Sequence, residues 1–488
     1  MGELSRRRRL LVLAICCVSL LMVGLDTTAV NVALPSVHRE LGVSLSGLQW
    51  TIDAYTVVLA SLLMLAGSVA DKIGRRTIFQ VGLVVFSLGS LLCGIAPNLE
   101  FLIAARVVQA IGGSMLNPVA MSIIRNVFDD PRERAAAFGM WGAVFGLSMA
   151  LGPVVGGALV DAVSWRAIFY VNLPFGLAGI IMTARLVPES RAARPRRLDL
   201  VGQVLVLAGL GALTFAIIEG PRTGWASAET LSVFALAALC LISLVPYELR
   251  SKEPLLEMGY FRSAPFSGAS AIAVLTFAGV GGFLFMNTFY LQTVRGLTAL
   301  GAGLYMLPMA AMILVCAPIS GRMFGKRGPR LPILTAAAVM VAAALMLTVL
   351  SPTTAAPYLL LAYLLFGIGN GLLSPTITNT AVTGMPAAQA GTASAIASTG
   401  RQVGTALGVA VIGAVSGSSA AGGPGKGFAA ATHAGWWIIV ALNLVILALG
   451  ALTTGRWAVA TAQRTAERLA KREHHDAYMG RSAEAVSE

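Results

Sequence analysis

The feature that most constrains this chain is a series of apolar runs, each about as long as a membrane-spanning helix. About 20 apolar residues cross the hydrocarbon core of a bilayer as a helix. Since a backbone in lipid must satisfy its own hydrogen bonds, such runs predict helices and not strands. Fourteen runs can be traced, at 10–34, 49–70, 78–96, 99–123, 135–160, 167–187, 200–218, 230–247, 266–291, 301–320, 331–350, 356–380, 390–416 and 434–455. The sequence therefore predicts an all-α polytopic membrane protein with 14 transmembrane helices.

The composition excludes the other broad classes of protein. Hydrophobic residues make up 57% of the chain and charged residues 12%, whereas an average soluble domain is about 25% charged. A chain of 488 residues with so few charges cannot cover a soluble surface, and it is too apolar to be intrinsically disordered.

The basic residues are distributed in a way that predicts the orientation of the chain in its membrane. Loops that carry an excess of Lys and Arg stay on the cytoplasmic side. With alternating turns assigned to the two sides, 28 of the 35 Lys and Arg residues fall on the side that holds both termini. We therefore expect a multi-pass membrane protein with both termini cytoplasmic. The net charge of +13 is then a topology signal, and no nucleic-acid partner is expected.

An internal repeat divides the chain. The pattern of residue types at 111–118 recurs at 368–375, and the pattern of the turn at 67–76 recurs at 321–330. The two offsets are nearly the same, about 257 residues. Two matches at one offset indicate a duplicated six-helix unit, and parallel repeats with a site between them are typical of transporters. This predicts a 6+2+6 arrangement: a first half at 1–190, two inserted helices with their loops at 191–263, a second half at 264–456, and a cytoplasmic tail at 457–488.

Three charged residues lie inside the predicted spans, where a charge costs about 2.5–3.5 kcal/mol and is a functional candidate by default. Asp26, Arg106 and Asp53 all fall at a similar depth in the outer half of the membrane, so they could share one cavity. A carboxyl group beside a movable arginine could change its protonation as the cavity opens to each side. The alternatives are a static salt bridge for Asp26 and an interfacial cap for Asp53.

A fourth intramembrane charge, Arg401, lies near the middle of the thirteenth run, which contains no Asp or Glu. It could serve an anionic substrate or a network of backbone carbonyls. Uncharged polar residues in several spans are candidates to line a central substrate cavity. They are Asn31, Gln109, Asn117, Tyr290, Asn370 and Asn379.

Two glycine patterns mark a turn and a helix seam. In the predicted inner turn between the second and third runs, the pattern consists of Gly67, Asp71, Gly74, Arg75 and Arg76. Here glycine permits a tight turn, and the Asp71 carboxylate can pair with Arg75 or a helix N-terminus. In the fifth run the pattern consists of Gly146, Gly152, Pro153, Gly156 and Gly157. Small residues on one face allow ordinary close helix packing, but they also suit a hinge or seam between the halves, which we favour.

The energy source follows from motifs that the sequence lacks. No G-x4-G-K-[ST] phosphate-binding loop and no redox or zinc constellation occurs. We therefore expect no cofactor and an ion gradient as the driving force, since one charge moved through 100 mV supplies about 2.3 kcal/mol.

Taken together, these motifs resemble those of the major facilitator superfamily, and specifically its fourteen-helix drug:proton antiporter branch. The turn at 67–76 resembles the signature loop of the superfamily, and Arg106 with Gln109 and Gly112 resembles its proton-coupling motif. The glycines of the fifth run resemble the antiporter motif. The resemblance implies that Asp26 and Arg106 form the proton-coupling pair and that residues 67–76 steady the outward-facing state. Because the thirteenth run carries Arg401 and no carboxylate, the resemblance does not imply that substrates with two positive charges are preferred.

The hypothesis is a proton-coupled efflux transporter that exports small amphipathic compounds such as antibiotics by alternating access. It would act as a monomer in the lipid of the bacterial inner membrane, with protons and a small-molecule drug or metabolite as partners, and it would not be an enzyme. The alternatives are a dedicated exporter of an endogenous secondary metabolite, an uptake symporter, and a non-transporting membrane sensor. The glycine- and proline-rich fifth run argues against a symporter, and the 33 residues at 456–488 are too few for a sensor domain.

Overall fold

A computed structural model describes residues 5–192, 198–251, 254–383, 385, 390–419 and 432–469. The distal part of the predicted tail, 470–488, lies outside the described residues. Within those ranges the ordered elements are helices, and no strand occurs among them.

The first part of the chain forms nine helices as far as the end of the predicted insertion. They are α1 (Arg6–Leu41), α2 (Leu45–Ile73), α3 (Arg75–Gly94), α4 (Leu99–Val127), α5 (Pro131–Ala162), α6 (Ala167–Tyr170), α7 (Asn172–Leu186), α8 (Leu200–Thr223) and α9 (Ala228–Arg250).

The second part begins with a short 3-10 turn, η1 (Met258–Arg262). Its itemised helices are α10 (Ala264–Phe289), α11 (Ala299–Tyr305), α12 (Leu307–Arg327), α13 (Arg330–Leu347), α14 (Ala356–Val382), α15 (Ala390–Ser419) and α17 (His433–Thr453). A π-helical turn, η2 (Tyr290–Val294), continues α10, and a further helix runs over 456–469.

The long helices follow the apolar runs of the sequence. In the described part of the chain, thirteen helices are long and apolar enough to cross a membrane. The thirteenth run, 390–416, corresponds to α15, which is not among those thirteen. The structure therefore confirms an all-helical chain with many membrane-spanning helices, while fourteen spans in a 6+2+6 arrangement remains a prediction. Two runs are divided within their length, one into α6 and α7 and the other into α11 and α12.

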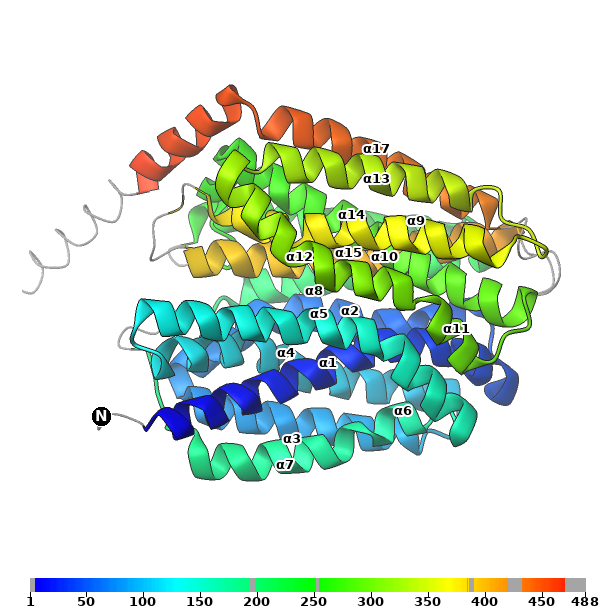
Figure 1. The fold of residues 1–488 in the computed structure, drawn as a ribbon, viewed down its shortest axis with the longest axis horizontal. Coiled ribbons are helices and arrows are strands. Elements are labelled where there is room, and N and C mark those ends of the chain that lie inside the picture. The colour runs from blue at the N-terminus through cyan, green and yellow to red at the C-terminus, as the bar shows by residue number, and fades with distance from the viewer. Residues whose placement is uncertain are drawn as a thin grey trace, which may run out of the picture.

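The helices gather into two groups that lie side by side. In Figure 1 the blue and cyan helices α1 to α7 lie below, and most helices of α10 to α17, which run from green to orange, lie above, while α11 reaches down on the right beside the end of α5. In the first group α1 packs against α5, and α3 against α4; in the second group α10 packs against α15, and α12 against α14. The inserted helix α8 packs against α2 and α15, one from each group, and α9 covers α8. We call the two groups the first half and the second half.

The two halves touch closely at the end of the bundle opposite to the start of α1. A Cβ atom added to Gly157 of α5 would lie 2.4 Å from the carbonyl oxygen of Ala299 in α11, and one added to Gly303 would lie 2.3 Å from that of Pro153. Beside this seam, the Gln49 side-chain amide of α2 donates to the carbonyl oxygens of Val409 and Ala410 in α15, at 3.0 and 2.9 Å. We call this end the closed end.

At the other end, where α1 begins, the halves separate. A Cβ atom added to Gly139 or Gly142 of α5, or to Gly321 or Gly325 of α12, would meet nothing within 4 Å. Figure 1 shows α5 and α12 approaching one another near α11 and diverging towards the N-terminal side of the molecule. The tight seam of the closed end therefore does not extend to this end of α5 and α12, which we call the open end.

Candidate functional site

The candidate site depends on an unusually close approach of α3 and α4. Glycines on both helices make this possible, because a Cβ atom at Gly112 would lie 2.2 Å from the backbone nitrogen of Phe86, and one at Gly89 would lie 2.5 Å from the backbone of Gln109. Backbone atoms cannot move aside for a side chain as a flexible side-chain tip can. The glycines therefore bring Ser90 of α3 within reach of side chains on α4.

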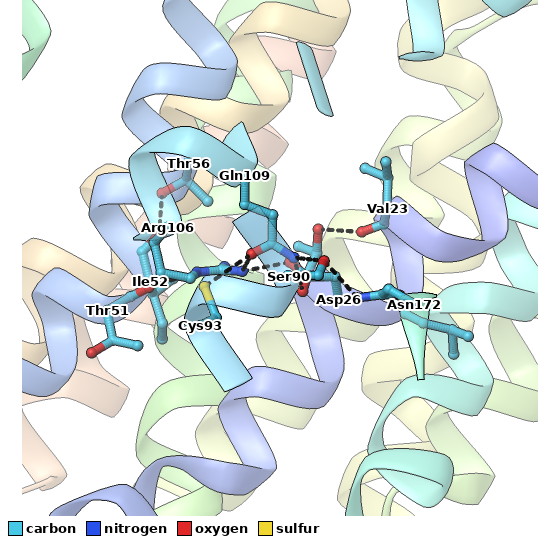
Figure 2. A network of polar contacts seen from close by, with 12 residues as sticks. Val23, Asp26, Thr51, Ile52, Thr56, Ser90, Cys93, Arg106, Gln109 and Asn172 are labelled. Carbon is cyan, nitrogen blue, oxygen red and sulfur yellow. Dashed lines mark hydrogen bonds and ion pairs between the residues drawn. The ribbon is translucent and has the colours of Figure 1, made fainter. Parts of the chain in front are cut away.

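Arg106 and Gln109 lie three residues apart on α4, so they share one face of that helix, and this face points at Asp26 of α1. The Arg106 Nη1 group donates to Asp26 Oδ2 at 2.6 Å and to Gln109 Oε1 at 2.7 Å. The Gln109 amide donates to Asp26 Oδ1 at 2.9 Å and to the Ser90 hydroxyl at 2.8 Å. Figure 2 shows these side chains converging from α1, α3 and α4. We call Asp26, Arg106 and Gln109, with Ser90, the charged network.

Aromatic rings and backbone from other helices enclose the arginine. Its Nε group donates to the carbonyl oxygen of Thr51 in α2 at 3.1 Å. Its guanidinium carbon lies 4.1 Å from the centre of the Tyr55 ring and 5.8 Å from that of Phe169. The side chains of Arg106 and Asp26 are 1% and 0% exposed. The ion pair is therefore sealed from solvent in this conformation.

This burial decides what the charged network can do chemically. Removing two charges from water is costly, and only good geometry with further hydrogen bonds recovers that cost. Both oxygens of Asp26 accept a hydrogen bond, and Arg106 donates to three acceptors. The two charges are therefore paired and hydrogen-bonded within the first half, and separating them would require α1 and α4 to move relative to one another.

The third predicted charge, Asp53, lies apart from this pair. It is 0% exposed, and its described hydrogen bond comes from the Thr56 hydroxyl on its own helix, at 3.3 Å. Its Oδ2 atom is buried without a hydrogen-bond partner. Gln49, one helical turn away, faces α15 of the second half. Asp53 is thus a buried carboxyl on the side of α2 that approaches the second half.

The turn between α2 and α3 is closed by two carboxylates at the open end. Asp71 accepts from Arg75 with N···O distances of 2.9 and 2.8 Å. Gly74 takes a φ of 140°, a backbone conformation that favours glycine. The Glu189 carboxylate follows α7 in the chain and folds back over the turn, so close that a Cβ atom on Gly74 would lie 2.7 Å from it.

Glu189 caps the start of α3, a contact that sequence reasoning missed. Its Oε2 atom accepts from the Thr77 hydroxyl at 2.6 Å, and its carboxylate also accepts from the backbone N–H groups of Arg76 and Thr77 at 3.1 and 3.2 Å. Burial raises the pKa of Glu189, but hydrogen bonds from these groups and from the Ser190 N–H outweigh burial, so the pKa lies below its ordinary value.

The glycine pattern of α5 serves two different contacts. A Cβ atom on Gly152 would lie 1.7 Å from the Thr28 hydroxyl oxygen, and one on Gly156 would lie 2.8 Å from the Ala29 Cβ, both on α1 of the same half. Gly157 instead faces α11 of the second half, and Gly146 is free of close contact, with its nearest neighbour at 3.8 Å. Close packing within one half and the seam between the halves thus both use this pattern.

The predicted cavity residues lie in different surroundings. Gln109 is fully buried within the charged network, and Tyr290 is fully buried and donates to the carbonyl oxygen of Ser351. Asn31 and Asn370 are 4% and 7% exposed. The remaining three, Asn117, Asn379 and Arg401, are partly exposed.

Among the described residues, no group of three or more His, Cys, Asp or Glu side chains lies close enough to hold a metal ion. The five cysteines are buried and unpaired.

Comparison with known proteins shows which family the chain belongs to. Residues 16–409 match the family model described as Major Facilitator Superfamily. The chain belongs to the Major Facilitator Superfamily. A solved structure titled as a bacterial homologue of the human lysosomal transporter Spinster superposes with a TM-score of 0.64 at 17% identity, covering 95% of this chain and 99% of that one.

Two curated relatives in this superfamily are named for resistance. The multidrug resistance protein Stp of Mycobacterium tuberculosis is 38% identical over 409 residues, which are 84% of this chain and 76% of the relative. The methylenomycin A resistance protein of Streptomyces coelicolor is 35% identical over 398 residues, 81% of this chain and 83% of the relative. The chain is therefore a multi-pass transporter of the facilitator superfamily that acts on small molecules, and it is not an enzyme.

Sequence reasoning named Asp26, Arg106 and Gln109 of the network, but not the contacts that Ser90, Thr51 and Tyr55 make with them. Serines, threonines and tyrosines are common in such spans, so their presence alone did not predict these contacts. The spacing of Arg106 and Gln109 was the available signal, since residues three apart share a helix face.

Proposed function

We propose that this facilitator is a drug:proton antiporter of the bacterial inner membrane, which exports small amphipathic compounds by alternating access. The observation that carries the proposal is the sealed ion pair between Asp26 and Arg106 inside the bundle. An intramembrane charge pair is costly and is a functional candidate by default. The resistance names of the relatives support the direction of transport.

The orientation of the bundle is taken from the basic residues. The open end carries the turns after α2, α4 and α12, where Lys and Arg are concentrated, and such turns stay in the cytoplasm. We therefore assign the open end, with both termini, to the cytoplasm and the closed end to the outside. The conformation described here then faces inward.

The proton cycle follows from the geometry of the charged network. In the inward-facing state Arg106 holds Asp26 as a carboxylate, so any proton carried by Asp26 has already been released to the cytoplasm. A substrate entering from the open end meets the transporter in this deprotonated form. When the closed end opens, the helices move, the ion pair loosens, and Asp26 takes a proton from outside as the substrate leaves.

Asp53 is a second candidate carrier in this cycle. It is a buried carboxyl without a described cationic partner, on the side of α2 that approaches the second half. Movement between the halves would change its access to water. The turn at 67–76, held by Asp71 and Arg75, would steady the cytoplasmic end when that end closes.

The test is drug-dependent proton movement in inverted membrane vesicles. The wild-type protein should release protons from acidified vesicles when an exported antibiotic is added, and Asp26→Asn should abolish this release. Asp161→Asn, which changes a carboxylate at the closed end that accepts from the N–H groups of Ala299 and Leu300, is the matched comparison and should retain coupling. If Asp26→Asn couples as well as the wild type, the assignment fails.

A further inference from the structure

One positive charge stands alone in the interior of the second half. The helices α10, α14 and α15 together contain a single charged residue, Arg401. In the first half the buried arginine, Arg106, is neutralised by Asp26 at 2.6 Å. Arg401 forms no ion pair with any carboxylate among the described residues.

The surroundings of Arg401 are polar but neutral. Its Nη1 group donates to the Thr378 hydroxyl of α14 at 3.2 Å, and its Nη2 group to the Ser398 hydroxyl of its own helix at 2.7 Å. Its guanidinium carbon lies 5.9 Å from the centre of the Phe277 ring on α10. These contacts do not include the network of backbone carbonyls that was one alternative for this residue.

The two hydroxyl groups accept hydrogen bonds from only part of the N–H donors of Arg401. A guanidinium carries five N–H donors in a fixed planar fork, and two of the five are used in the contacts above. A charge in the membrane interior that is neither paired nor fully hydrogen-bonded is expensive. The residue is partly exposed, so the protein does not enclose its side chain completely.

The depth of Arg401 places it within reach of the open end. It lies eleven residues after Ala390, the first residue of α15, which corresponds to roughly 16 Å along the helix at 1.5 Å per residue. Along α15, Arg401 thus lies between the start of the helix at the open end and Val409 and Ala410, which accept from Gln49 at the closed end.

We infer that Arg401, with the hydroxyl groups of Thr378 and Ser398, binds the carboxylate of a small amphipathic acid, and that the apolar body of this acid lies against Phe277. A carboxylate matches the fork of an arginine with two parallel hydrogen bonds. The same positive charge disfavours cationic compounds at this position. This inference rests on the proposed export function, and it names the substrate class that the site in the second half prefers.

The experiment compares two probes that differ in one charge, the fluorescent acid dansylglycine and its neutral methyl ester. Binding of each is measured by the fluorescence of the dansyl group, with the purified full-length protein in detergent. The wild type should bind the acid about tenfold or more tightly than the ester, because charge-assisted hydrogen bonds are lost with the ester. Arg401→Gln should abolish this preference while the binding of the ester stays unchanged.

Control variants make each result decisive. Arg322→Gln removes the same charge from an exposed position on α12, and it should keep the preference for the acid. Arg401→Lys should keep part of it, because a lysine retains the charge without the planar fork. The inference is overturned if the wild type binds the acid no better than the ester, if Arg401→Gln keeps the preference, or if that variant loses both probes equally.

The binding measurement also separates this inference from the proposed function. No proton gradient exists in detergent, so a preference for the acid does not depend on proton coupling. If Asp26→Asn still releases protons from acidified inverted vesicles when drug is added, while Arg401→Gln loses its preference for the acid, the coupling assignment fails and the acid site stands.

Discussion

The two halves of the molecule pack helices against one another through glycines in the same way, but they differ in the polar side chains that they bury. In the first half Gly152 and Gly156 of α5 press against α1. In the second half Gly404 and Gly408 of α15 press against α10, where an added Cβ atom would lie 2.3 and 2.0 Å from backbone oxygens. Small residues allow such close approach in lipid. The close approach of these helices is therefore common to both halves and cannot explain their difference.

The difference lies in the buried polar groups. Tyr363 of α14 occupies the position 257 residues after Arg106, the offset of the internal repeat. Its hydroxyl donates to Asn287 Oδ1 of α10 at 2.5 Å, and Phe283 packs against its ring. A neutral pair in the second half thus stands where the first half has an ion pair. The first half thus buries a pair of opposite charges where the second half buries a neutral hydrogen bond, and under the proposed function the first half alone would change its charge.

The largest expected effect comes from breaking the ion pair. Arg106→Gln leaves Asp26 buried without its cation, so we expect the free energy of unfolding to fall by about 3–5 kcal/mol and proton-driven transport to be lost. Denaturant titration in detergent measures the first effect, and vesicle transport the second. Arg322→Gln, at an exposed site, should change neither. A loss below 1 kcal/mol for Arg106→Gln would mean that the pair is not a structural feature of the first half.

The next effect concerns the seam at which the halves meet. In Gly303→Ala the new Cβ atom would lie 2.3 Å from the Pro153 carbonyl oxygen, so the closed end can form only with strain. We expect a loss of about 1–3 kcal/mol in the free energy of unfolding, the usual cost of overpacking, together with slower transport. Gly142→Ala, where nothing lies within 4 Å, is the matched control and should be neutral or slightly stabilising. If Gly303→Ala and Gly142→Ala changed the free energy of unfolding and the transport rate equally, the seam would not be tight.

A smaller effect is expected at the neutral pair of the second half. Tyr363→Phe removes one hydroxyl and its hydrogen bond to Asn287, so the free energy of unfolding should fall by about 1 kcal/mol. Proton coupling should persist, because no charge is changed. The same denaturant titration and vesicle assay used for Arg106→Gln apply. Loss of coupling in Tyr363→Phe would contradict the assignment of coupling to the first half alone.

Much of the fold and part of the site could be predicted from the sequence, for a physical reason. Whether a segment is apolar enough to lie in lipid depends on its own residues alone. The long helices therefore follow the apolar runs. Arg106 and Gln109 share a face through helix geometry alone. The meeting of Asp26 and Arg106 was predicted from their equal depth in the membrane, because both charges needed a partner there.

The placement of Asp53 shows where this reasoning ends. Equal depth suggested that it could share a cavity with the ion pair, yet the described contacts of α2 with Arg106 are made by the Thr51 backbone and the Tyr55 ring. Residues two apart point to nearly opposite sides of a helix with 3.6 residues per turn. The rotation of a helix about its own axis depends on packing against distant segments. The contact of Glu189 with a turn more than a hundred residues earlier depends on distant packing in the same way. The local sequence pattern encodes neither the rotation of α2 nor this contact.

The smallest expected effect again compares equivalent places in the two halves. Glu189 closes the turn after α2, whereas at the equivalent turn after α12 a Cβ atom on Gly328 would meet nothing within 4 Å. Because the pKa of Glu189 is lowered in the folded protein, its contribution to stability is complete above the unfolded pKa of about 4.3. It is lost as the pH falls through the lower folded value.

For this partly exposed group we expect Glu189→Gln to lower the free energy of unfolding at pH 7 by less than about 1 kcal/mol. The difference from wild type should shrink towards zero below about pH 4. Thermal unfolding in detergent at a series of pH values measures this, and Glu229→Gln, at an exposed position on α9, should give a constant offset. A difference that stays the same at pH 3 and pH 7 would mean that the Glu189 charge does not hold this turn, and that the two turns differ in packing alone.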